Sequence, residues 1–437
     1  MNIMEAQAVL VATHVATIRQ SDTGLASVDR CATMLLESGP GVGKSQSIRQ
    51  MVERLCLILG EPVGFVVEML ATLTSADVRG FGLPVRDAVT GQVNMVFSTP
   101  PWFPSYDNTW VCAPDPDNAG RVVWYSPNAS HNLWTAFNLG LNPSGPKWTD
   151  PANDNKPRPL PRVGVVFLDE WGQAQDEVKA PSAELLLNGG VGNTYLPPLW
   201  RVVAATNRMA DRSAVLRELM FTVNRRCLLP ITPDCDAWVH WATHQPAHLR
   251  PHHMLITYAQ KHATLMFKDA VPDKPDPFGT PRSYVKMDYC LRSIRTQAEI
   301  NQDILPTSKL ARELCAGFIG DAEMNMFFTH MKFYDQIPDI KDIIADPTKA
   351  TVPKEESAQM VCAYMLSHHV NDDTAAPIFT YVKRLSREMQ IACIRATRGS
   401  GKSTDFADLR RAKAISSAPG FSEWLVENQD VLMAVSF

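Results

Sequence analysis

The sequence lacks the features that mark membrane-spanning, secreted or disulfide-stabilised proteins. No stretch approaches the roughly 18 uninterrupted apolar residues that a membrane span requires. Residues 1–20 have no basic segment ahead of an apolar core, so they do not resemble a secretory signal. The nine cysteines are scattered and never spaced as C-x-x-C, which argues against a disulfide framework and a cysteine-type zinc site. We therefore expect a cytoplasmic protein with no membrane partner.

An excess of charge of one sign is also missing. The 437 residues include 42 Lys and Arg against 46 Asp and Glu, which gives a net charge of −4. This balance excludes a uniformly basic nucleic-acid coat, although it leaves room for a local basic groove. With 45% apolar and 20% charged residues, the composition is that of an ordinary globular protein. At about 150 residues per domain, the length suggests about three domains.

Apolar runs that alternate with helical patterns predict an α/β fold with a parallel sheet. The runs are continuously apolar, as expected for strands covered on both faces, and they lie at 32–36, 65–69, 163–168, 202–206 and 228–231. Beyond residue 233 the strand-like runs largely stop and helical patterns dominate. We therefore predict three parts, namely an α/β domain over 1–232, a helical domain over 233–330 and a C-terminal helical extension over 331–437.

The segment from Ser38 to Ser45, SGPGVGKS, carries the strongest functional signal. It follows the apolar run 32–36 and opens a segment with helical spacing of apolar residues, with Gly60 where a helix would end. Glycines in such a strand–loop–helix unit let backbone N–H groups surround phosphate oxygens, while Lys44 contacts the β- and γ-phosphates and Ser45 binds Mg²⁺. The predicted nucleotide-binding residues are Gly39, Pro40, Gly41, Val42, Gly43, Lys44, Ser45 and Gln46.

Two further strands end in polar residues. The run Val165-Val166-Phe167-Leu168 leads into Asp169 and Glu170, and a second run leads into Asn207. Beside a phosphate loop, Asp169 would hold Mg²⁺ through water, and Glu170 would orient and deprotonate the attacking water. Asn207 would form a hydrogen bond with the γ-phosphate or with that water.

Taken in order, these segments resemble the AAA+ ATPases, and within them the MoxR-like group, including its phage and prophage members. Asn224-Arg225-Arg226 before the last strand and Thr280-Pro281-Arg282-Ser283 at a later helix start also match. The segment 77–84, DVRGFGLP, resembles the entry to the helix-2 insert of that group, and 185–198 resembles its pre-sensor-1 hairpin. The resemblance covers most of the chain.

The resemblance implies an AAA+ core with a helical lid and ATP hydrolysis in a homo-oligomeric ring, hexameric in the family. Arg225 is then the arginine finger, which acts on a neighbouring subunit's nucleotide. Such a residue stabilises the charge of the transition state and raises the rate of hydrolysis by a factor of about 10³–10⁵. Arg226 is a second candidate, although the family usually has an apolar residue at that position. Arg282 on the lid is sensor 2. A protein client and a partner with a von Willebrand factor A domain are also implied.

The main departure from the family is an insertion at about 105–161. Lys44 and Asp169 are 125 residues apart, which is longer than the family pattern implies. We expect an irregular but ordered segment between two core strands, because exposed tryptophan is costly in water. Either its tryptophans pack within the protein or part of this surface binds a partner or client. Residues 100–161 contain five of the ten tryptophans, namely Trp102, Trp110, Trp124, Trp134 and Trp148.

Two other patterns have weaker support as functional sites. The string GSGKST at 399–404 follows a helical segment and not a buried strand, so we interpret it as a solvent loop. Histidines recur every four residues at 240, 244, 248 and 252, but Pro246 and Pro251 would interrupt the helix that a metal site of this kind needs. We interpret them as packing or surface residues.

Three functions fit the motifs to different degrees. The favoured one is an ATP-driven ring motor or chaperone that remodels a protein client. The alternative is a nucleic-acid motor or loader, in which bases of the nucleic acid could stack on the tryptophans. However, residues 100–150 contain only Arg121 and Lys147 as basic residues, so a positively charged track for the phosphates is missing there. A nucleotide-gated scaffold without catalysis is disfavoured by the joint presence of Glu170, Asn207 and Arg225.

Overall fold

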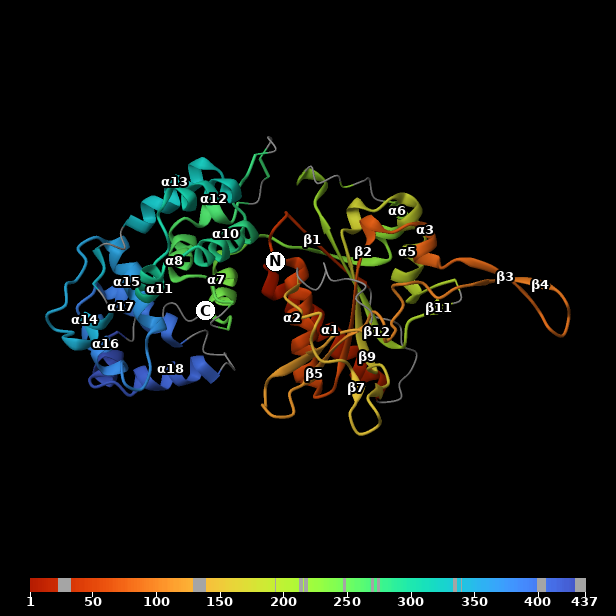
Figure 1. Ribbon diagram of the computed structural model, residues 1–437, viewed down its shortest axis with the longest axis horizontal. Coiled ribbons are helices and arrows are strands. Elements are labelled where there is room, and N and C mark those ends of the chain that lie inside the picture. Colours follow the sequence, from red (N-terminus) through yellow and green to blue (C-terminus); the bar gives the residue numbers. More distant parts are fainter. Residues whose placement is uncertain are drawn as a thin grey trace. The chain divides into compact units, whose positions relative to one another are not determined.

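The computed structural model describes most of the chain, which divides into two compact units. The first contains residues 1–233 with 269–271, and the second contains 234–268 with 272–437. Figure 1 shows the sheet of the first unit and the helices of the second. The described residues are 1–22, 33–128, 139–192, 194–211, 215, 219–246, 249–268, 271–272, 276–332, 336–338, 340–398 and 406–428.

The first unit is built on a seven-stranded sheet, whose order within the described residues is β13-β1-β12-β9-β2-β5-β6. The last two strands in this order, β5 (Trp110–Pro114) and β6 (Val122–Tyr125), are antiparallel to their neighbours. Each apolar run expected from the sequence overlaps one parallel strand, so the predicted α/β fold with a parallel sheet is confirmed. The parallel strands are β13 (Arg226–Pro230), β1 (Thr33–Ser38), β12 (Leu199–Asn207), β9 (Val163–Asp169) and β2 (Val63–Met69).

Helices cover both faces of the central sheet. Successive side chains of a strand point to opposite faces, so each strand contributes to the apolar layer on either side. Phe65 and Val67 of β2 pack in one apolar layer with α1 (Ile3–Asp22) and α2 (Lys44–Leu59). Val66 packs in the opposite layer with α3 (Ser75–Arg79) and α5 (Asp176–Asn188). Burial on both faces is the reason that the central strands are continuously apolar.

The insertion at 105–161 is more regular than its composition suggested. The expectation of an irregular segment was wrong for β5 and β6, which extend the main sheet through antiparallel pairing of β5 with β2. The side chain of Trp110 is buried in the layer with α2, and Trp124 donates from Nε1 to Glu53 of α2 at 2.8 Å. Trp102 is also buried, while Trp134 lies outside the described residues. These contacts hold the rings of Trp102, Trp110 and Trp124 within their own unit.

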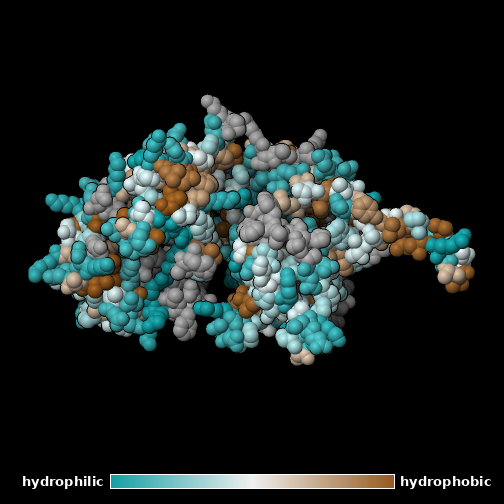
Figure 2. Space-filling view, viewed as in Figure 1, coloured by the Kyte–Doolittle hydropathy of each residue, from teal (hydrophilic) through white to brown (hydrophobic). Residues whose placement is uncertain are grey.

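A hairpin formed by β3 (Gly82–Arg86) and β4 (Val93–Phe97) lies outside both apolar layers. We call residues 81–97 the apolar hairpin, because it projects from the sheet unit and is rich in apolar surface (Figures 1 and 2). Its base is closed by reciprocal backbone and side-chain hydrogen bonds between Phe81 and Ser98. Its exposed large apolar side chains are Phe81, Leu83, Val85, Val89, Val93, Met95, Val96 and Phe97.

A second, short hairpin lies in the segment that resembles the pre-sensor-1 hairpin. It pairs β10 (Gly190–Val191) with β11 (Thr194–Tyr195) directly after α5. Gly189 ends α5 in the left-handed region at φ 64°, where glycine carries no steric cost. This turn leads the chain back to β12 and its polar end.

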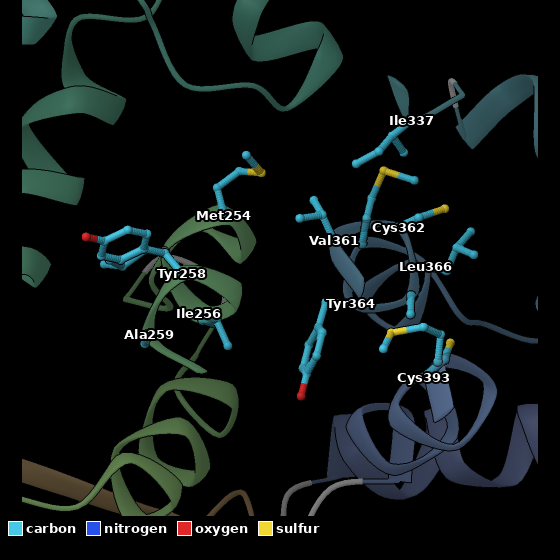
Figure 3. Packing of buried hydrophobic residues seen from close by; sticks show 14 of the residues in the cluster. Met254, Ile256, Tyr258, Ala259, Ile337, Val361, Cys362, Tyr364, Leu366 and Cys393 are labelled. Carbon is cyan, nitrogen blue, oxygen red and sulfur yellow. The ribbon is translucent and has the colours of Figure 1, made fainter. Parts of the chain in front are cut away.

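The second unit is helical, and one hydrophobic core runs through it from Trp238 to Trp424. Figure 3 shows residues of α8 and α15 that belong to this core. The predicted lid and C-terminal extension therefore share packing, and their separation at residue 330 stays a prediction. No helix among the described residues is long and apolar enough to cross a membrane. The helices are α7 (Cys235–Thr243), α8 (His253–Lys261), α9 (Ala263–Met266), α10 (Pro281–Ser293), α11 (Gln297–Gln302), α12 (Lys309–Ile319), α13 (Asp321–Met331), α14 (Ile340–Ala345), α15 (Glu356–His368), α16 (Ala375–Val382), α17 (Arg387–Arg398), α18 (Phe406–Ser416) and α19 (Phe421–Glu427).

Candidate functional site

The predicted phosphate loop joins the end of β1 to the start of α2. Gly41 and Gly43 have φ angles of 76° and 100°, a region that side chains with a Cβ atom avoid. Gly43 is the N-cap of α2, and Lys44, Ser45 and Gln46 form its first turn. The loop therefore places the N–H groups of a helix N-terminus, with the positive end of its dipole, beside the predicted lysine.

Lys44 is buried, and its ammonium group is surrounded by oxygen acceptors. Within the loop, Nζ donates to the Ser38 hydroxyl at 2.9 Å and to the Gly39 carbonyl at 3.2 Å. It also donates to Oδ1 of Asn207 at 2.9 Å. Asn207 lies there because β1 and β12 are parallel neighbours in which Ser38 pairs with Asn207. The sheet thus joins the predicted phosphate-binding lysine to the predicted sensor residue.

Ser45 and Asp169 form the second contact of the site. The Ser45 hydroxyl donates to Oδ2 of Asp169 at 2.7 Å, which joins the first turn of α2 to the end of β9. A hydroxyl and a carboxylate are the hard oxygen ligands that Mg²⁺ prefers. The two residues predicted to hold Mg²⁺ therefore lie together, and their chemistry fits that ion.

Glu170 follows Asp169 in an uncommon backbone conformation. Its φ and ψ are 57° and 37°, the left-handed region that costs a residue with a Cβ atom about 1–2 kcal/mol. Its N–H donates to Oδ1 of the Asp169 side chain at 2.9 Å. The chain then enters a short 3₁₀ helix, η2 (Trp171–Gln173). Strained residues that the surrounding structure holds in place are frequent at functional sites.

Sequence analysis missed Arg208, which lies beside the phosphate loop. A Cβ atom on Gly39 would lie 3.1 Å from Nη2 of Arg208. The guanidinium is held in a two-pronged contact by Asp211, with Nε–Oδ2 and Nη2–Oδ1 distances of 3.0 and 2.9 Å. Its position directly after Asn207 is the only signal in the sequence that could have suggested it.

The two candidate finger residues have different surroundings. Arg225 follows α6 (Met220–Val223), and its guanidinium lies 5.4 Å from the ring centre of Phe221, which is exposed. The guanidinium of Arg226 lies 5.8 Å from the ring centre of the buried Trp171, the residue after Glu170. Arg225 is therefore associated with an exposed apolar surface, and Arg226 with the interior of its own unit.

Arg282 belongs to the second unit, so it is described only within that unit. It is the second residue of α10, and its side chain is exposed. The helix begins with a capping box, in which Thr280 accepts from Ser283 N at 3.1 Å and Ser283 Oγ accepts from Thr280 N at 2.7 Å. The predicted sensor 2 arginine thus lies on a well-capped first turn.

Part of the histidine pattern lies in a polar cluster of the second unit. The side chains of His252, His253 and Asp303 offer groups within 4.8 Å of one another. However, His252 donates from Nε2 to the Asp303 carbonyl at 2.9 Å and accepts from Met254 N through Nδ1 at 3.2 Å. Arg295 also binds the Asp303 carboxylate, and the contact with His252 holds the pKa of Asp303 well below its ordinary value. These contacts describe a hydrogen-bonded ion cluster at the start of α8.

No protein-family model and no curated protein sequence matches this chain. Among solved structures, it is similar to a point mutant of RuvB from Thermotoga maritima, with 10% identity and a TM-score of 0.32 over 77% of this chain and 74% of that one. A Cytophaga hutchinsonii protein proposed to be an ATPase has 9% identity and a TM-score of 0.27, over 74% of this chain and 94% of that one. NtrX from Brucella abortus has 13% identity and a TM-score of 0.23, over 92% of this chain and 67% of that one. These values are too low to transfer a function from any of the three.

Proposed function

We propose that the protein is a Mg²⁺-dependent ATPase that works as an AAA+ motor of the MoxR-like type. The observation that supports this best is the convergence of four predicted residues in two contacts, Lys44 with Asn207 and Ser45 with Asp169. They come from three separate parts of the sequence and share the edge of the sheet where the parallel strands β1, β9 and β12 end. Ligands bind at this edge in open α/β sheets.

Each residue has a defined role in the proposed reaction. The N–H groups of the loop and the Lys44 ammonium bind the phosphates of ATP, while Ser45 and Asp169 hold Mg²⁺, which neutralises phosphate charge when bound. Glu170 accepts a proton from a water molecule whose oxygen attacks the γ-phosphorus, and the bond to the ADP oxygen breaks. Asn207 orients the γ-phosphate or that water.

The proposal includes assembly into a homo-oligomeric ring, hexameric as in the family, in which Arg225 completes the site of a neighbouring copy. Arg225 is adjacent to exposed apolar side chains of α6, Met220, Phe221 and Val223, whose burial against a second copy would be favourable. Arg226 contacts Trp171 of its own unit, which favours Arg225 as the residue that acts in trans.

The remaining parts of the proposal concern the lid and the client. Arg282 would report the nucleotide state from the lid, and the protein would remodel a protein client in the cytoplasm with a partner that contains a von Willebrand factor A domain. The apolar hairpin supports a client- or partner-binding role, because a contiguous exposed apolar surface commonly marks an interaction site. The Trp-rich insertion has less support for this role, because two of its described rings, those of Trp110 and Trp124, pack on the sheet and α2.

The central experiment measures ATP binding and ATP hydrolysis by Glu170→Gln. We expect nucleotide affinity to stay near that of the wild type and turnover to fall at least about 100-fold, since the water loses its base. Glu177→Gln is the matched control, because Glu177 is an exposed carboxylate of the same unit. Wild-type turnover by Glu170→Gln would remove Glu170 from the proposed role.

The action of Arg225 in trans needs a mixing experiment. Arg225→Ala should bind ATP but hydrolyse it about 10³-fold more slowly. Mixed with Lys44→Ala, it should regain activity, because an intact nucleotide site then meets an intact arginine across an interface. Arg226→Ala is the comparison variant. Lack of recovery in verified mixed oligomers would contradict action in trans.

A further inference from the structure

In the turn that follows Glu170, side chains form hydrogen bonds with both the backbone N–H and the backbone carbonyl of Gly172. The N–H of Gly172 donates to the Thr206 hydroxyl at 3.1 Å. The carbonyl of Gly172 accepts from Nζ of Lys179 at 3.1 Å. Gly172 therefore joins the end of β9 to β12 on one side and to α5 on the other.

The packing around Gly172 leaves no room for a side chain at this position. A Cβ atom at residue 172 would lie 2.3 Å from Oγ1 of Thr206 and 2.8 Å from Cγ1 of Val215, closer than real contacts allow. The preceding Trp171 is fully buried in the layer that contains α5. Both residues that follow Glu170 are thus fixed by the interior of the unit.

The Lys179 side chain is fully buried, although charged groups are rarely buried without a function or a partner. Its ammonium group contacts the carbonyl of Gly172, the second residue after Glu170. Thr206 is also buried, and its hydroxyl donates to the carbonyl of Asn207 at 2.9 Å. One hydroxyl therefore contacts both the turn after Glu170 and the residue predicted to sense the γ-phosphate.

We propose that Thr206 and Lys179 are positioning residues for Glu170. They hold Gly172 from opposite sides and so maintain the left-handed backbone conformation of Glu170, which the chain would otherwise leave. Thr206 also fixes the distance between the Glu170 turn and Asn207. This inference rests on the proposed ATPase function and deepens it, because it assigns the residues that orient the base.

The decisive variants are Thr206→Val and Thr206→Ser. Valine matches the shape of threonine but has no hydroxyl, whereas serine keeps the hydroxyl and loses the methyl group. We expect Thr206→Val to lower kcat about 10- to 100-fold with little change in the KM for ATP, and Thr206→Ser to recover most of the loss. Lys179→Met, which keeps the length of the chain but removes the ammonium, should act in the same direction.

A double-mutant cycle and hydrogen exchange separate positioning from general destabilisation. In a Glu170→Gln background, Thr206→Val should have no further effect on turnover, because both changes act through the same group. Amide exchange in a peptide that covers 169–175 should accelerate in Thr206→Val but not in Thr206→Ser. The exchange measurement needs no activity, so it remains informative for any variant that folds.

The outcomes distinguish this inference from the function on which it rests. If the wild type hydrolyses ATP and Glu170→Gln does not, but Thr206→Val has wild-type kcat and exchange, only the positioning role is overturned. Equal losses of kcat in Thr206→Val and Thr206→Ser would also overturn it, because packing and not the hydroxyl would then be responsible. A wild-type protein without ATPase activity would overturn both.

Discussion

The polar edge of the sheet and the apolar hairpin depart in opposite directions from the rule that apolar residues are inside and polar residues outside. At the edge, Lys44 is only 8% exposed, and its ammonium group donates to Ser38, Gly39 and Asn207. In the hairpin, Val89 is 94% exposed and Leu83 is 53% exposed. The same unit thus buries a charge and exposes apolar side chains.

The comparison shows how each departure is tolerated. The buried ammonium donates several hydrogen bonds to the loop and to a neighbouring strand, which compensates for the loss of hydration. The hairpin has no apolar layer of its own, and a two-stranded hairpin alone is only marginally stable in water. It is held at its base by the contacts between Phe81 and Ser98. The proposed nucleotide site would account for the first departure, and the proposed binding of another molecule would account for the second.

The largest expected effect comes from deletion of whole segments. Replacement of 105–161 by a Gly/Ser linker should prevent folding, because it removes β5, β6 and the buried Trp110 from the sheet. Replacement of 82–97 by a similar linker should leave a folded protein with nearly unchanged thermal unfolding. Circular dichroism and a thermal melt test both deletions. A cooperative, wild-type melt of the 105–161 deletion would contradict the assignment of these strands to the core.

The next effect concerns the buried charge itself. Lys44→Ala should weaken ATP binding at least about 100-fold, because the phosphates lose the side-chain cation that lies beside Ser38, Gly39 and Asn207. Equilibrium binding of a fluorescent ATP analogue measures the change. Lys309→Ala is the control, since that side chain is 91% exposed in the other unit. Unchanged affinity in Lys44→Ala would refute the phosphate-loop assignment.

A buried polar residue away from the edge provides a test of whether burial alone implies function. His14 donates from Nε2 to the Leu199 carbonyl at 3.1 Å, and burial lowers the pKa of His14 from 6.5 to about 4. Since the unfolded chain binds this proton more tightly, stability should be complete above about pH 6.5 and fall towards pH 4, by up to about 3 kcal/mol.

His14→Gln keeps an amide donor but does not titrate, so it should reduce this loss of stability. Urea unfolding at pH 7.5 and pH 4.5 for both proteins gives the difference. ATP binding at pH 7.5 should be unaffected, because the residue has a structural role. An identical pH dependence in the variant would exclude His14 as the source.

The smallest effect contrasts two valines in the same kind of element. Val66→Thr in β2 introduces a hydroxyl at a fully buried position and should cost about 1–3 kcal/mol of unfolding free energy. Val96→Thr in the apolar hairpin should change stability by less than about 0.5 kcal/mol, because that position is exposed. Denaturant unfolding measures both. A large loss in Val96→Thr would indicate that the hairpin packs on the protein in solution.

The sequence predicted the parallel strands and the polar edge because their signals are local. A continuously apolar run that ends in Asp169 and Glu170 reports a strand and its terminus directly, and the loop from Ser38 to Ser45 reports its own backbone conformation. Parallel order then brings Lys44 to Asn207 and Ser45 to Asp169 without any further signal. Their roles in catalysis stay predictions.

The features that sequence analysis missed depend on distant partners. Trp110 and Trp124 appeared in a stretch rich in Pro, Asn and Gly, yet β5 pairs with β2, whose residues lie about 45 positions earlier in the chain. The role of Gly172 depends on Thr206 and Lys179, which lie in different elements. Neither relation has a local pattern, because the pairing of β5 and the contact of Gly172 with Thr206 arise from the order of strands in the sheet, and the contact with Lys179 depends on the path of α5.

The alternation of side chains along β9 has a consequence for the evolution of this protein. Phe167 contributes to the layer with α2, Leu168 to the opposite layer, and Asp169 again points towards Ser45 of α2. One residue inserted or deleted within β9 would reverse this parity and turn the carboxylate away from the phosphate loop. Two residues would restore it. In descendants of this sequence, length changes that survive within β9 should therefore be even in number.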